Sequence, residues 1–217
     1  MARKRYSRTI GKSIAGFLLA VVAYLGLQYG TMLNDMNRAA GLYRQGDIEG
    51  ALKTYESVEQ RIRTYSAMRI IPTRDRQNLF LNEARLLYTL KKYDDAANRL
   101  EKEAEISGVT TDGRFFLLRG DIGFRRAILG YQQSAPNVYT QYSPKNDVSL
   151  LEENLLASED SFLESLRLNP NDWDAKYNFE FVNNIRKSVT ASGQEKLNLL
   201  QETEKPQTKE LPPESAG

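Results

Sequence analysis

Residues 36–62 read MNRAAGLYRQGDIEGALKTYESVEQRI, and this stretch decides the fold because its apolar residues recur at helical spacing on both sides of a turn. The recurring positions, three or four residues apart within each helix, are Met36, Ala40, Tyr43, Ala51, Tyr55, Val58 and Ile62. Gly46 stands where the first helix must end, and Asp47 is suited to cap the second. The stretch therefore predicts two antiparallel helices that pack through one apolar stripe each.

Residues 79–106 repeat the arrangement with LFLNEARLLYTLKKYDDAANRLEKEAEI. Their apolar stripes contain Ala84, Leu87, Ala96, Leu100 and Ala104. Two further helical patterns follow at 112–133 and 148–168, separated by residues 134–147, which contain two prolines and no helical period. A last helix is predicted from residue 173 to 188. Because every pattern is helical and β-branched runs are scarce, the predicted fold class is all-α.

The third and fourth helical patterns each predict one buried and one solvated face. The positions expected to be buried are Phe116, Leu117, Gly120, Phe124 and Ile128 in the third, and Leu151, Leu155, Phe162 and Leu166 in the fourth. The fourth pattern also carries an acidic run of Glu152, Glu153, Glu159, Asp160 and Glu164. Because these acids spread outward from the leucine stripe, we expect a solvated face and not a pair of catalytic carboxylates.

Residues 14–33 read IAGFLLAVVAYLGLQYGTML and contain no charged side chain. A helix of this length extends about 30 Å, which is the thickness of the hydrocarbon core of a bilayer. A cleaved signal peptide also begins with a basic segment and an apolar run, but this run is longer than usual and no Ala-x-Ala-like cleavage site follows it. We therefore expect an uncleaved single transmembrane helix, with cleavage as the alternative.

The basic excess of the chain lies at its N-terminus. Residues 1–12 hold five Lys and Arg and no acid, and since the whole chain carries +2, the remainder carries −3. Lys and Arg beside a span favour the cytoplasmic side, which places a basic arm of residues 1–13 in the cytoplasm and the body outside it. A basic tail without a basic domain face argues against nucleic acid as a partner.

Gly26 and Gly30 form a G-x-x-x-G pair within the predicted span. Such pairs let two membrane helices approach closely, so a homodimer through this face is one interpretation. Glycine is common in membrane spans, however, and we do not expect a dimer from this pair alone.

The sequence contains neither histidine nor cysteine. This excludes thiolate nucleophiles, disulfides and zinc sites with imidazole or thiolate ligands, and it removes the side chain that most often moves protons near neutral pH. Oxygen ligands for calcium remain at Asp172, Asp174 and Asn178, but acids in a first helical turn are typical caps and the EF-hand pattern is absent. We expect no catalytic activity, no cofactor and no metal.

The two hairpins resemble the tetratricopeptide repeat. The residues that carry the resemblance are Ala51 with Tyr55, Ala96 with Leu100, and the turn Gly46-Asp47-Ile48. The two alanines lie 45 residues apart, against a family period of about 34, so the array is degenerate. The resemblance implies a helical-hairpin array over residues 34–188 with the last helix as a cap. The polar, proline-containing composition of residues 189–217 predicts a disordered tail.

In that repeat family the first helix of each pair lines a groove. The register places five side chains of this chain along it, namely Tyr43, Arg44, Asn78, Arg85 and Tyr88. The resemblance thus implies a peptide groove in which Arg and Asn hold carboxylates or main chain and the tyrosines stack on the peptide. The alternative is that the tyrosines are packing residues and the arginines are solvated.

Residues 166–182, LRLNPNDWDAKYNFEFV, form the sharpest local pattern, through Asp172, Trp173, Asp174, Tyr177, Asn178 and Glu180. This ending resembles that of MxaK-like proteins, which are small membrane-attached repeat proteins encoded beside MoxR-type ATPases and von Willebrand A-domain proteins. Some of them serve methanol dehydrogenase maturation. The resemblance implies an extracytoplasmic scaffold whose protein partners in the envelope are of the von Willebrand A-domain or MoxR type. A general role in envelope assembly or division, unrelated to MoxR, is the alternative.

Overall fold

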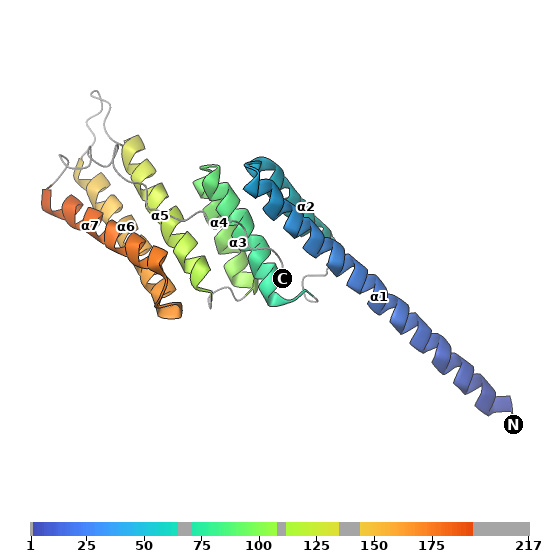
Figure 1. Ribbon diagram of the computed structural model, residues 1–217. Coiled ribbons are helices and arrows are strands. Elements are labelled where there is room, and N and C mark those ends of the chain that lie inside the picture. The colour runs from blue at the N-terminus through green and yellow to red at the C-terminus, as the bar shows by residue number, and fades with distance from the viewer. Residues whose placement is uncertain (1, 65–70, 108–111, 135–143, 193–217) are drawn as a thin grey trace. The chain divides into compact units, whose positions relative to one another are not determined.

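Seven helices and no strand form within the residues that the computed structural model describes, which are 2–64, 71–107, 112–134 and 144–192 (Figure 1). The predicted all-α class is therefore confirmed for this part of the chain. The helices belong to two compact units, of which unit 1 ends at Pro72 and unit 2 begins at Thr73.

Unit 1 is a hairpin of α1 (Ala2–Arg44) and α2 (Ile48–Thr64). Gly46 adopts a positive φ of 86°, a conformation that commonly ends helices and that residues with a Cβ rarely adopt. The main-chain N–H of Gly50 donates to Asp47 Oδ1 at 2.9 Å, so Asp47 caps α2. The roles predicted for both turn residues are confirmed.

The facing stripes of α1 and α2 form the core of unit 1. The buried members of the predicted stripes are Met36, Ala40, Ala51, Tyr55, Val58 and Ile62. The Tyr55 hydroxyl donates to the main-chain oxygen of Met36 at 3.3 Å, which satisfies the polar end of a buried ring. The packing predicted for the first hairpin is therefore confirmed.

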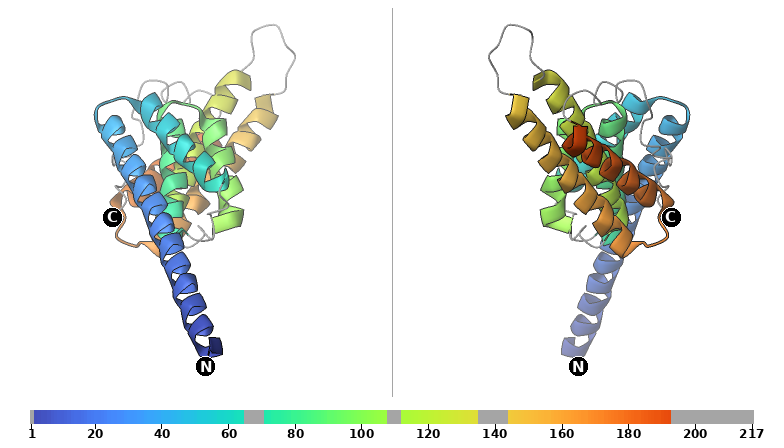
Figure 2. Two further views of the ribbon diagram at one scale, coloured as in Figure 1. Left: turned by 90° about the vertical axis from the view of Figure 1, so that its right-hand side faces the viewer. Right: turned by 90° about the vertical axis from the view of Figure 1, so that its left-hand side faces the viewer.

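The N-terminal half of α1 extends far beyond α2 (Figure 2). The helix is continuous from the predicted span into the hairpin, and residues 12–44 are long and apolar enough to cross a membrane. Apolar side chains of this half are uncovered; Leu19, for example, is 70% exposed. The hydroxyl of Thr31 donates to the Gln28 carbonyl at 2.8 Å, so this polar group is satisfied within the helix. α1 is thus a candidate membrane span.

Unit 2 consists, in its described residues, of α3 (Thr73–Thr89), α4 (Tyr93–Ser107), α5 (Gly113–Ser134), α6 (Pro144–Leu168) and α7 (Trp173–Ser192). Each helix packs against the next, and α5 also contacts α3 and α7. The right-hand view of Figure 2 shows α7 lying across α5 and α6. α5 is therefore the central helix of this unit.

Two hydrophobic clusters hold unit 2 together, and α5 contributes to both. The cluster of α3, α4 and α5 contains Leu81, Ala84, Ala96, Ala97, Leu100, Phe115, Leu118 and Ile122. The cluster of α5, α6 and α7 contains Phe124, Ala127, Leu151, Leu155, Phe162, Val182, Ile185 and Val189. Because α5 is covered on two sides, a single stripe does not describe it. Of the five residues predicted to be buried on this helix, Gly120 and Phe124 are buried. The other three, Phe116, Leu117 and Ile128, are half-buried.

Gly120 allows α5 and α6 to approach closely. A Cβ at Gly120 would lie 2.5 Å from a ring carbon of Phe162, which is itself buried in the second cluster. At the end of the same interface, the Ser165 hydroxyl donates to the main-chain oxygen of Gly113 at 2.8 Å. These contacts fix the register of α5 on α6.

Glu159 corrects the expectation of a wholly solvated acidic run on α6. Only 4% of Glu159 is exposed, and Nε of Arg186 on α7 donates to its Oε1 at 2.6 Å. Helical spacing predicts which face of α6 a residue lies on. It does not predict that α7, which follows later in the chain, covers part of that face and buries Glu159. The other acids of the run are at least partly exposed.

α7 runs to Ser192, so the first residues of the predicted tail are helical. Val189 is buried in the second cluster, which explains why the helix continues there. The tail after Ser192 and the side chain of Ala104 lie outside the described residues.

Candidate functional site

Asp121 lies at the centre of a buried polar cluster in unit 2. It belongs to α5, the helix that contacts both α3 and α7, and its side chain is almost fully buried. The amide nitrogen of Asn178 on α7 donates to Asp121 Oδ1 at 2.8 Å. Because removing a carboxyl group from water is costly, such a group needs partners of this kind. The hydrogen bond ties α5 to α7.

Burial raises the pKa of Asp121 from 3.8 to about 8. The charges of Arg125 and Arg85 oppose this rise. The carboxylate of Asp174 adds to it, and the hydrogen bond from Asn178 lowers the pKa again. At pH 7 Asp121 is therefore mostly protonated, and a protonated carboxyl group both donates and accepts hydrogen bonds.

Two oxygen atoms of the Asp121–Asn178 pair are buried and have no hydrogen-bond partner among the described residues. They are Asp121 Oδ2 and Asn178 Oδ1. A proton on Asp121 supplies the donor that the amide oxygen lacks, so the neutral acid can form two hydrogen bonds with the amide. An ionised carboxylate has no such donor. The arrangement of the pair thus favours the protonated form of Asp121.

Tyr88 joins this cluster from α3. Nε of Arg125 donates to the Tyr88 hydroxyl at 3.3 Å, and the Tyr88 ring packs edge-on against Tyr93 with centroids 5.4 Å apart. Burial raises the pKa of Tyr88, and the Asp121 carboxylate, which is ionised in the pH range where a tyrosine titrates, raises it further; the Tyr88 hydroxyl therefore stays neutral and available as an acceptor. The cluster therefore links α3, α5 and α7.

Residues from two separate sequence predictions meet around Asp121. Arg85 and Tyr88 belong to the predicted groove, and Asp174 and Asn178 belong to the pattern of residues 166–182. Two of the five predicted groove residues and two residues of the terminal pattern thus share one neighbourhood of unit 2.

Sequence reasoning did not single out Asp121 or Arg125. Both lie in the helical stretch FFLLRGDIGFRRAIL, where an acid within an apolar run is the one available signal. A charge at such a position requires either exposure or a partner. The sequence does not say which partner, because Asn178 follows 57 residues later.

The other predicted groove residues are Asn78 of unit 2 and Tyr43 and Arg44 of unit 1. Asn78 is buried in α3, and its Oδ1 has no hydrogen-bond partner among the described residues. In unit 1, Tyr43 is half-buried, while Arg44 is exposed and its Nε donates to the main-chain oxygen of Ala40 at 3.3 Å.

The remaining residues of the terminal pattern have local roles at the start of α7. Asp172 caps the helix, because its Oδ1 accepts the main-chain N–H of Ala175 at 3.0 Å. Trp173 is 77% exposed, with the Lys176 ammonium 4.8 Å from its ring centroid. Glu180 is exposed as well.

Tyr177 continues the exposed aromatic face of α7. The residue is 40% exposed, and its ring stacks on Phe181, with centroids 6.3 Å apart and planes 10° apart. Phe181 in turn meets Phe124 of α5 edge-on at 5.7 Å. Rings on α7 therefore form a continuous path from the core of unit 2 to its surface.

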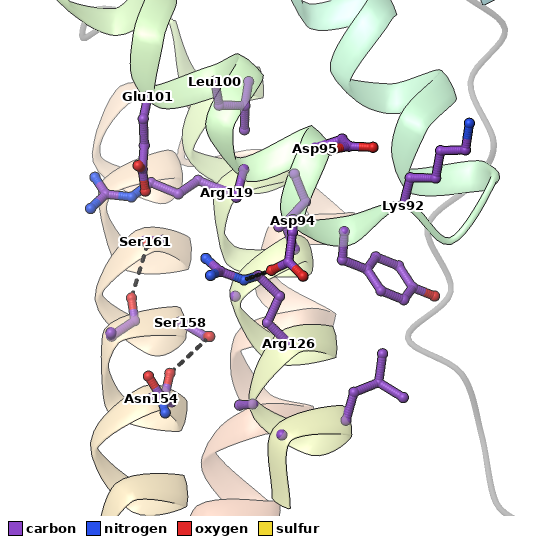
Figure 3. A pocket seen from close by; sticks show the side chains of 18 of the residues that line it. Lys92, Asp94, Asp95, Leu100, Glu101, Arg119, Arg126, Asn154, Ser158 and Ser161 are labelled. Carbon is purple, nitrogen blue, oxygen red and sulfur yellow. Dashed lines mark hydrogen bonds and ion pairs between the residues drawn. The ribbon is translucent and has the colours of Figure 1, made fainter. Parts of the chain in front are cut away.

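A cleft of about 1120 Å³ lies over α5, between α4 and α6 (Figure 3). Its apolar lining includes Leu100, Phe115, Phe116, Ile122, Ala127 and Leu129, and its charged lining includes Lys91, Lys92, Asp94, Asp95, Glu101, Arg119 and Arg126. Nε of Arg126 pairs with Oδ1 of Asp94 at 2.8 Å.

Figure 3 shows Ser158 and Ser161 on the α6 wall of this cleft. Both hydroxyls donate to main-chain oxygens of their own helix, at 3.0 and 2.9 Å. An activated serine nucleophile instead needs an adjacent general base. Neither of these two hydroxyls is arranged in that way in the structure.

Among the described residues, no group of three or more acidic side chains is positioned to share a metal ion. No protein-family model, curated protein or solved structure matches the chain. Both family resemblances therefore rest on motifs in the sequence, and the site rests on its geometry.

Proposed function

We propose that the chain is a membrane-anchored scaffold that binds a protein partner outside the cytoplasm, through a degenerate tetratricopeptide-like array with α7 as its cap. Its architecture supports this proposal, because α1 is long and apolar enough to span a membrane and unit 2 contains successive packed helices. A span confines the array to the membrane, which raises its effective concentration toward partners there. The mechanism is recognition without chemistry.

The exposed ring of Trp173 carries this proposal. Trp173 and Tyr177 are four residues apart and share one face of α7, where both are exposed. A large aromatic side chain adds little to folding when it stays in water, and aromatic side chains contribute most strongly to protein interfaces. The face of α7 around Trp173 is therefore the proposed contact surface.

Trp173→Ala is expected to weaken partner binding by about 30-fold, the loss for an interface side chain that contributes about 2 kcal/mol. The free energy of unfolding should change little, because the ring is exposed. The measurement is affinity capture from detergent-solubilised membranes with quantification of the recovered partner. Trp173→Phe, which keeps an aromatic ring, is the matched control. Equal recovery by Trp173→Ala and the wild type would contradict the proposal.

For the partner we propose an envelope protein of the von Willebrand A-domain or MoxR type, on the resemblance of residues 166–182. The same capture experiment should recover such a protein with the wild type and not with Trp173→Ala. Recovery of a different protein in a Trp173-dependent manner would overturn this partner. It would favour the general role in envelope assembly or division.

The proposed orientation is testable because the sequence has no cysteine, so that one introduced cysteine is a unique label site. A membrane-impermeant maleimide added to spheroplasts should label Ser149→Cys on α6, where Ser149 is exposed, and not Ser7→Cys in the arm. Both variants should react after lysis. Labelling of Ser7→Cys alone would reverse the orientation, and labelled Ser149→Cys in the soluble fraction would indicate cleavage of the span.

A further inference from the structure

A cavity of about 240 Å³ lies between α1 and α2 in unit 1. Its apolar walls include Leu25 and Met32 of α1 and Val58 and Ile62 of α2. The volume is that of about eight molecules of liquid water. Apolar walls offer water few hydrogen-bond partners, so the cavity suits an apolar ligand better than solvent.

The cavity lies along the C-terminal end of the candidate span. The helix from Leu25 to residue 33 is about 12 Å long, and one leaflet contributes about half of the 30 Å hydrocarbon core. The cavity therefore faces the acyl-chain region of one leaflet. Leu25 both lines it and is 40% exposed, so its wall is continuous with the uncovered apolar surface of α1.

Arg61 of α2 lines the same cavity and pairs with Asp35 of α1, two residues beyond the predicted span. Its guanidinium is partly exposed, and guanidinium groups bind phosphate well. Tyr29, four residues before the end of the predicted span, also lines the cavity, and tyrosine is enriched at membrane–water interfaces. The cavity thus has apolar walls at the depth of the lipid acyl chains and the Arg61 guanidinium at the depth of the lipid headgroups.

We propose that this cavity binds one acyl chain of a membrane phospholipid, with the phosphate of that lipid at Arg61. The inference rests on the proposed membrane anchoring. A phospholipid held there contacts α1 and α2 together and couples the hairpin to the membrane surface. The site is distinct from the partner-binding face of α7.

The experiment uses the full chain in phospholipid nanodiscs that contain a phospholipid with a photoactivatable diazirine on its acyl chain. We expect crosslinks on α2, at the peptide that contains Val58 and Ile62, as well as on α1. Leu25→Trp and Gln28→Trp, which place a large ring at lining positions, should each lower crosslinking to α2 by about tenfold. That loss is expected when two methylene groups are no longer buried.

Leu19→Trp is the matched control, because Leu19 is exposed on the same helix and does not line the cavity. Its crosslinking to α2 should equal that of the wild type. Crosslinks confined to α1, or equal crosslinking to α2 in all variants, would overturn the lipid site. Failure of the wild type to enter nanodiscs would instead overturn the membrane anchoring on which the site depends.

Discussion

Asp121→Asn is expected to remove a pH dependence of stability that the wild type shows between about pH 4 and pH 8. The pKa of Asp121 is near 3.8 in the unfolded chain, and burial raises it to about 8 in unit 2. Between these values the folded state binds a proton that the unfolded state lacks, so the free energy of unfolding falls as pH rises. One such group contributes a slope of about 1.4 kcal/mol per pH unit. Its stabilising effect is complete below pH 4 and lost by about pH 8.

Asparagine resembles the protonated form of Asp121. Its side chain is neutral, has nearly the same size, and both donates and accepts hydrogen bonds. The variant should therefore keep the link to Asn178 and be more stable than the wild type above pH 8. Arg85, Arg125 and Asp174 surround the position in both proteins, so the difference between them isolates the Asp121 carboxyl group.

The measurement is urea unfolding of the full chain in detergent micelles, followed by circular dichroism at several pH values from 4 to 9. Asp94→Asn is the matched control, because the Asp94 side chain on α4 is 80% exposed and its pair with Arg126 contributes little to stability. This control should follow the wild-type profile. Parallel profiles for the wild type and Asp121→Asn would show that Asp121 is ionised in the folded state.

The first hairpin was predictable because its determinants are local. A glycine with positive φ, an aspartate three residues before the amide that it caps, and apolar residues at helical spacing all act within one or two turns. Tyr55 shows the limit of this reasoning. Its burial follows from spacing, whereas its hydrogen bond to Met36 depends on how the two helices cross.

The buried polar contacts were less predictable because their partners lie far away in the sequence. Glu159 follows a spacing that is typical of a solvated face, but Arg186 of α7 covers and pairs with it. Asp121 likewise depends on Asn178. The terminal pattern indicated Asn178 through a resemblance, and the structure supplies a physical role for it as a partner of a buried acid.

A second large effect is expected at the buried ion pair between α3 and α4. Arg99→Met should lower the free energy of unfolding of unit 2 by about 3 to 5 kcal/mol. The Glu83 side chain is only 2% exposed, and Arg99 both donates to its carboxylate and lies over the Phe80 ring, 4.6 Å from the centroid. Methionine keeps much of the side-chain volume but removes the cation that pairs with the buried Glu83, and a buried charge that loses such a cation is costly.

The double variant Glu83→Gln with Arg99→Met separates this cause from a loss of packing. If the lost cation is responsible, a neutral residue at position 83 should restore most of the stability that Arg99→Met removes. Arg126→Met is the control, because the Arg126–Asp94 pair is exposed and should contribute less than about 1 kcal/mol. The measurement is urea unfolding of the wild type, the two single variants Arg99→Met and Glu83→Gln, the double variant and the control Arg126→Met. The first four of these proteins form a double-mutant cycle. Equal losses for Arg99→Met and for the double variant would assign the effect to packing against Phe80 and not to the charge of Glu83.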